Sequence, residues 1–86
     1  MPQNNIFLVE DIFSIAGMGT VVAGALMGGQ LKSGMKAIIN GKTAIIGSIE
    51  QYNKQIDEVT IVGSKVGIML KNVEKSDITT ETISFS

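Results

Sequence analysis

The chain has 86 residues, which suits one small domain near the lower end of the sizes that fold without help. It has no cysteine and no histidine, which excludes disulfides and thiolate metal sites and removes the commonest general base. Seven lysines, no arginine and eight acidic residues give a net charge of −1, whereas dedicated nucleic-acid binders usually carry a basic excess. We therefore expect no metal, no cofactor and little binding energy from phosphate contacts.

Two features of the sequence bear on export and membranes. We expect residues 1–5 to form a flexible N-terminus. They lack the basic start of a signal peptide, so we expect the protein to be cytoplasmic. Residues 12–31 are uncharged, and Gly24 and Gly28 match the GxxxG pattern of packed membrane helices. This stretch holds five glycines and lacks flanking arginine or aromatic anchors. Buried strands also read as continuous apolar runs, so we expect strands and no membrane span.

The first half of the chain reads as strands joined by glycine turns. Residues 6–15 predict one long strand interrupted by an acidic pair, and residues 20–27 predict a second strand after a turn at 17–19. Glycines 28 and 29 break or bulge that strand. Another turn at 32–34 leads to a strand at 35–39. The dipeptide Asn40-Gly41 then predicts a type I′ hairpin.

The second half continues this pattern. The return strand at 42–52 changes its apolar phase near Gly47, which predicts a bulge there. An extended region at 56–61, a turn at Gly63-Ser64 and a strand at 65–70 follow. Residues 74–78 suit one helical turn, and residues 83–86 alternate as a final strand. Short strands with frequent turn signals and no long amphipathic helix predict an all-β sandwich or barrel.

The run VEDIFSIAGMGTVVAG at residues 9–24 resembles the opening of domain 2 in elongation factor Tu and related translation GTPases. In that family the run is close to VED-V-FSI-xGRGTVV-T-G. The likeness continues in order at residues 29–34, 49–50, 62–67, 70–73 and 77–78, and covers about residues 6–85. It implies that residues 1–86 form a single domain, a closed six-stranded Greek-key barrel of the translation-factor type.

In elongation factor Tu this barrel helps to hold the 3′ end of aminoacyl-tRNA, so the resemblance implies a site. The positions near the esterified amino acid are Glu10, Asp11 and Phe13. The positions of the terminal-adenine pocket are Ile15, Val21, Glu50 and Met69. A base would stack between the aliphatic walls, and the Glu50 carboxylate would accept a hydrogen bond from the ribose 2′-OH.

The sequence departs from the family pattern at several of these positions. Met18 replaces an arginine, Ala23 replaces a threonine, and Ala25 replaces a basic residue. Lys65, which we include in the candidate groove, stands where the family has asparagine, and Thr80-Glu81 replaces a late Arg-Gly. These changes remove cations and hydrogen-bonding groups from the face that contacts RNA and the neighbouring domain in the family.

Other chemistry finds little support in the sequence. There is no G-x-x-x-x-G-K-[ST] motif, so we expect no GTP binding by this chain alone. Adjacent strand residues point to opposite faces, so Glu10 and Asp11 do not suit a catalytic pair. The lysines at 32, 36 and 42 form either a weak positive patch or a solvated edge, and Met18 and Met27 either an adaptable surface or core.

Two functions remain open. The first is a non-enzymatic, monomeric binding module related to translation factors, with the tRNA 3′ end, the ribosome or a translation factor as its partner. The second is a structural or protein-interaction barrel that has lost contact with RNA, which the missing arginines favour.

Overall fold

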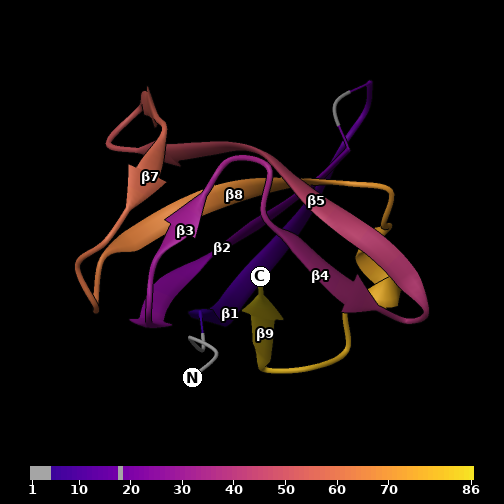
Figure 1. Ribbon diagram of the computed structural model, residues 1–86. Helices are drawn as coiled ribbons and strands as arrows, with labels where there is room; N and C mark the ends of the chain where they lie inside the picture. The colour runs from indigo at the N-terminus through magenta and orange to yellow at the C-terminus, as the bar shows by residue number, and fades with distance from the viewer. Residues whose placement is uncertain (1–4, 18) are drawn as a thin grey trace.

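Six strands of the chain wrap into a nearly closed antiparallel barrel (Figure 1). The computed structural model describes residues 5–17 and 19–86. The barrel strands are β1 (Asn5–Ile15), β2 (Gly19–Gly28), β4 (Lys36–Ile39), β5 (Lys42–Gln51), β8 (Lys65–Lys71) and β9 (Thr82–Phe85). Their spatial order is β4-β5-β8-β2-β1-β9, so β2 pairs with β8 and β9 returns to β1 in a Greek-key arrangement. The predicted six-stranded all-β barrel is confirmed.

The ring of strands closes where β4 meets β9. The backbone N–H of Lys36 donates to the carbonyl of Ser86 at 2.9 Å, and the N–H of Ser86 donates to the carbonyl of Lys36 at 2.8 Å. Reciprocal bonds of this kind are the pattern of an antiparallel hydrogen-bonded pair. This link between the two end strands makes the barrel nearly closed.

Three short strands extend the barrel at one side. β6 (Lys54–Ile56) pairs with β5, and β3 (Leu31–Lys32) pairs with β7 (Glu58–Val59) to form a separate two-stranded sheet. In Figure 1, β3 and β7 lie together at the left of the barrel. The side chains of Leu31 and Val59 are buried, so this small sheet adds apolar contacts to the core.

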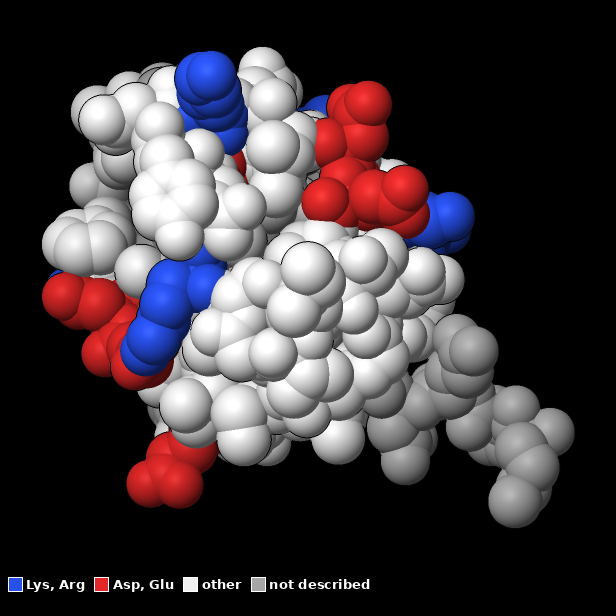
Figure 2. All heavy atoms as spheres, turned by 90° about the vertical axis from the view of Figure 1, so that its left-hand side faces the viewer, with Lys and Arg blue, Asp and Glu red and all other residues white. Residues whose placement is uncertain are grey.

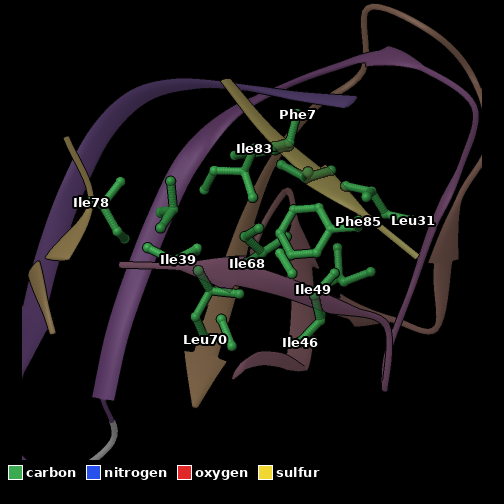
Figure 3. Packing of buried hydrophobic residues seen from close by; sticks show 14 of the residues in the cluster. Phe7, Leu31, Ile39, Ile46, Ile49, Ile68, Leu70, Ile78, Ile83 and Phe85 are labelled. Carbon is green, nitrogen blue, oxygen red and sulfur yellow. The ribbon is translucent and has the colours of Figure 1, made fainter. Parts of the chain in front are cut away.

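The core forms because inward-facing residues alternate along the strands. On β8, for example, Val66, Ile68 and Leu70 are buried while the residues between them face outward. Figure 3 shows Phe7, Phe85 and the surrounding aliphatic side chains packing together inside the barrel. Complete burial of one such side chain contributes about 1.5–3 kcal/mol, which is the main stabilisation available to a chain without disulfides.

Two hairpins turn on two residues with positive φ. Asn40 and Gly41 have φ of 51° and 75° between β4 and β5, as the predicted type I′ turn requires. Tyr52 and Asn53 have φ of 53° and 64° between β5 and β6. The prediction that the β5 strand continues through Tyr52 was wrong, because this second tight turn ends the strand at Gln51.

Register shifts interrupt three of the long strands. The first β1–β2 shift, between Ile6 and Phe7, leaves Met27 of β2 as an extra residue. The β5–β8 register shifts between Ile46 and Ser48, which confirms the bulge predicted at Gly47. The β1–β2 register shifts between Val9 and Asp11, leaving Glu10 as the extra residue. Val9 and Ile12 both pack against the core, whereas Glu10 and Asp11 are both exposed. The expectation that the two acids point to opposite faces was therefore wrong, since the bulge resets the alternation between them.

The start of β1 is anchored by Asn5. Its buried side-chain amide donates to the carbonyl of Phe85 at 3.1 Å, and its side-chain oxygen accepts from the N–H of Gln30 at 3.0 Å. The expected flexible start therefore does not include Asn5, while residues 1–4 and Met18 lie outside the described residues. Residues 12–31 form the end of β1, all of β2 and the start of β3, as predicted.

Among residues 5–17 and 19–86, no helix has the length and apolar character needed to span a bilayer.

The helical turn predicted at residues 74–78 forms as the 3₁₀ turn η1 (Lys75–Asp77). The carboxylate of Asp77 joins this turn to the β4–β5 hairpin. The buried Asp77 carboxylate accepts from the N–H of Glu74, the ammonium of Lys42 and the side-chain amide of Asn40, each at 2.8 Å. The hydrogen bond from the Glu74 N–H, with those from Lys42 and Asn40, lowers the pKa of Asp77 to about 2. The same hydrogen bond between Lys42 and Asp77 raises the pKa of Lys42.

The three lysines around this hairpin have separate neighbours. The Lys32 ammonium lies 3.8 Å from the Glu58 carboxylate, and the Lys42 ammonium lies 2.8 Å from Asp77. Lys36 sits at the closure of the barrel. Two of the three charges are thus already paired, which favours the interpretation as a solvated edge.

Candidate nucleic-acid interface

The predicted apolar site residues meet on the outer face of three neighbouring strands, β1, β2 and β8. Phe13 on β1 is the cross-strand partner of Val21 on β2, Val21 of Met69 on β8, and Met69 of Ser48 on β5. Cross-strand partners project to the same side of a sheet. Phe13 is 47% exposed, and Val21 and Met69 are half-buried. We call Phe13, Val21 and Met69 the apolar row.

A second row lies two residues along the strands from the first. Asp11 pairs with Ala23, Ala23 with Gly67, and Gly67 with Glu50. Its two central members have almost no side chain, and a shallow groove of about 330 Å³ runs over them. We call this the Gly67 groove. It is lined by Glu10, Ala23, Gly24, Glu50, Gln51, Tyr52, Lys65, Val66 and Gly67.

Glycines keep this face open. A Cβ on Gly67 would lie 3.8 Å from Val21 Cγ1, so the apolar row borders the groove directly. A Cβ on Gly47 would lie 2.8 Å from Met69 Cε and 2.9 Å from Lys71 Cε. The Met69 and Lys71 side chains therefore lie across the β5 bulge, and the Lys71 stem widens the apolar surface.

Ile15 and Glu50 stand at opposite ends of this surface. Ile15, paired with Gly19 at the end of β1, is 41% exposed on the same face as Phe13. Glu50 is exposed beside the groove, and none of the ion pairs within the described residues involves it. Its carboxylate therefore keeps its capacity to accept hydrogen bonds from a ligand.

The acidic pair of β1 is already engaged by the protein. The Lys65 ammonium lies 2.7 Å and 2.6 Å from the two carboxylate oxygens of Glu10. The Asp11 carboxylate accepts a 2.9 Å hydrogen bond from the N–H of Ile12. The ion pair bridges the β1 bulge and the start of β8, so it bounds one end of the Gly67 groove.

All eight predicted positions thus lie on or beside one face. Glu10 and Lys65 bond to each other, whereas Glu50 is in none of the ion pairs of the described residues. Sequence reasoning missed Tyr52, which lines the groove from the β5–β6 turn and is 87% exposed. The available signal was the pair Tyr52-Asn53 between two extended segments. Asparagine favours left-handed turn positions, but tyrosine at such a position gives no standard turn signal.

The charges on the face beside β3 and β7 do not gather into a basic surface. Figure 2 shows the face on the side of β3 and β7, where lysines and acidic residues are scattered between broad uncharged areas. This distribution agrees with the net charge of −1. Phosphate contacts on this face would be few and separate.

Comparisons with known proteins relate the barrel to translation factors. No protein-family model matches the chain. Among solved structures, the chain is similar to the apo form of translation elongation factor SelB from Methanococcus maripaludis, with a TM-score of 0.81 and 26% sequence identity. The match covers 96% of this chain and 18% of the SelB chain.

The fold and the collinear sequence blocks therefore agree. The strand order, the near closure and the SelB match support the resemblance first indicated by the run at residues 9–24. The chain thus has the fold of a translation-factor-type β-barrel and resembles domain 2 of elongation-factor-Tu-like GTPases.

Proposed function

We propose that the barrel binds the 3′ end of a single-stranded RNA, such as the CCA end of tRNA, on the outer face of β1, β2, β8 and β5. One observation carries the proposal. The strand register makes Phe13, Val21 and Met69 successive neighbours and places Glu50 beside them on the same face. The residues implied by the family resemblance thus form one contiguous surface.

The chemistry of this surface suits a terminal nucleoside. Val21, Met69 and Ile15 offer partly exposed aliphatic walls for the flat base. The Glu50 row lies two residues farther along the strands, about 7 Å at 3.3 Å per residue, which is within the reach of a ribose beyond the base. The Glu50 carboxylate would accept a hydrogen bond from the 2′-OH, the group that distinguishes RNA from DNA.

The energies predict weak binding. With a net charge of −1 and no arginine, counterion release contributes little, so the salt dependence should be shallow. Stacking contributes about 1–3 kcal/mol per base, and the ribose contact adds one hydrogen bond. A dissociation constant of about 1 µM needs about 8 kcal/mol, so micromolar affinity is an upper bound for the isolated barrel.

The test is a backbone NMR titration with a short RNA ending in CCA and with the same oligonucleotide carrying a 2′-deoxy terminal residue. We expect shifts at Ile15, Val21, Glu50 and Met69 with the RNA and weaker binding of the deoxy form. Glu50→Gln should blunt that discrimination, while the control Lys36→Ala at the barrel closure should change nothing. Equal binding of both oligonucleotides, or no binding at low salt, would contradict the proposal.

A specific observation also favours the second function, a protein-interaction barrel. The N–H of Gly63 donates to the carbonyl of Leu26 at 2.7 Å, which holds the β7–β8 turn beside the end of β2. Exposed Ile61 and Val62 on this turn lie close to exposed Met27. Such a cluster suits a protein partner. The test is a backbone NMR titration with a separately produced GTP-binding domain of an elongation factor. The chemical-shift changes that this domain causes should disappear in the Val62→Lys variant.

A further inference from the structure

Tyr52 occupies a backbone conformation that its side chain does not favour. It has φ of 53° at the first position of the β5–β6 turn, a left-handed region that bulky residues rarely adopt. The equivalent turn between β4 and β5 uses Asn40 and Gly41, which are the residues preferred there. The β5–β6 turn could form more easily with asparagine or glycine in place of tyrosine.

Packing does not explain this choice. The Tyr52 side chain is 87% exposed, so its ring contributes little to the core. It lines the Gly67 groove together with Glu50, two residues earlier on β5. Strained backbone and an exposed aromatic ring thus coincide at the edge of the candidate site, where such strain is commonly functional.

We propose that Tyr52 stacks on a second base of the bound RNA, so that the site takes an oligonucleotide end rather than a single nucleoside. This inference rests on the proposed RNA-binding function. The terminal base would lie at the apolar row, and the next base would cross the Gly67 groove to reach the ring. Aromatic side chains are the usual platforms for successive bases of single strands.

The surroundings of the ring fit this occupant. Ala23 and Gly67 leave the floor of the groove flat between the apolar row and Tyr52.

The experiment compares adenosine with the trinucleotide CCA as ligands for the wild-type protein and for Tyr52→Asn. We expect Tyr52→Asn to leave adenosine binding unchanged and to weaken CCA binding roughly 5- to 150-fold, which corresponds to the loss of one stacked base. Tyr52→Phe should bind CCA like the wild type. Asparagine suits the turn, so Tyr52→Asn should also melt no lower than the wild type.

Tyrosine fluorescence reports directly on Tyr52, because the chain has one tyrosine and no tryptophan. Its fluorescence should be quenched by CCA and much less by adenosine. If Tyr52→Asn binds CCA as well as the wild type while Glu50→Gln still loses ribose discrimination, the Tyr52 inference is overturned and the proposed function stands. Equal losses in Tyr52→Phe and Tyr52→Asn would also overturn it. Failure of the wild type to bind either ligand would overturn both.

Discussion

The ammonium of Lys65 holds both carboxylate oxygens of Glu10, at 2.6 Å and 2.7 Å, across the bulge of β1. Two residues of the predicted groove are therefore bonded to each other. The ammonium of Lys65 balances the negative charge of Glu10 next to the Gly67 groove, where an unpaired negative charge would repel a phosphate. Lysine in place of the family asparagine thus changes the electrostatics of the site without changing the fold.

This ion pair should contribute little to stability, since both side chains are largely exposed. We expect Lys65→Asn to change the free energy of unfolding by less than about 1 kcal/mol. The same variant should weaken RNA binding, because the negative charge of Glu10 is then unpaired beside the groove. Urea denaturation and the NMR titration measure the two effects. A large loss of stability, or stronger RNA binding, would show that the pair has a different role.

The Asp77 cluster predicts a dependence of stability on acid pH. The folded-state pKa of about 2 lies below the ordinary 3.8, so the ionised carboxylate stabilises the folded state. That contribution is complete above about pH 5 and is lost as the pH falls through 4 towards 2. Asp77→Asn should lower Tm at pH 7 and flatten the fall of Tm between pH 5 and 2. The exposed Asp57→Asn serves as the control that keeps the wild-type slope.

Gly24, which pairs with Val9 next to the β1 bulge, occupies a position that accepts only glycine. A Cβ on Gly24 would lie 1.8 Å from the carbonyl oxygen of Leu8, a contact that the backbone must move to relieve. We expect Gly24→Ala to destabilise the barrel by more than about 3 kcal/mol or to prevent folding. Thermal melting followed by circular dichroism checks this. A variant that melts like the parent would mean that β1 and β2 are farther apart than described.

The β4–β5 turn predicts a smaller effect of conformational origin. Gly41 has φ of 75°, and the space around its absent Cβ is open. We expect Gly41→Val to cost on the order of 1 kcal/mol or more, from the left-handed backbone alone. Urea denaturation measures this cost. Unchanged stability would indicate that the turn can rearrange without penalty.

Much of the fold followed from local patterns that the tertiary structure did not override. Asn40-Gly41 and the phase change at Gly47 predicted a turn and a bulge correctly because each depends on neighbouring residues. The bulge at Glu10 was missed, since it depends on the pairing of β1 with β2 rather than on the composition of β1. The turn at Tyr52 was missed because its first residue opposes the conformation it adopts.

The candidate site was predictable only in part for a similar reason. The resemblance identified which positions share the outer face, and the register then placed Phe13, Val21 and Met69 side by side. The bond between Lys65 and Glu10 joins residues 55 positions apart and depends on side chains that differ from the family pattern. Neither hydropathy nor turn signals carry information about such a contact.

The central claim, that a base lies on the outer face beside Gly67, is tested most directly by filling that space. Gly67 is an outward residue of β8, and an added Cβ would make only an ordinary contact with Val21 at 3.8 Å. Valine has a higher strand propensity than glycine, so Gly67→Val should fold at least as stably as the wild type. We predict that this variant keeps its Tm and loses the NMR shifts caused by the CCA-ended RNA. A stable Gly67→Val barrel that still binds this RNA with wild-type affinity would contradict the account.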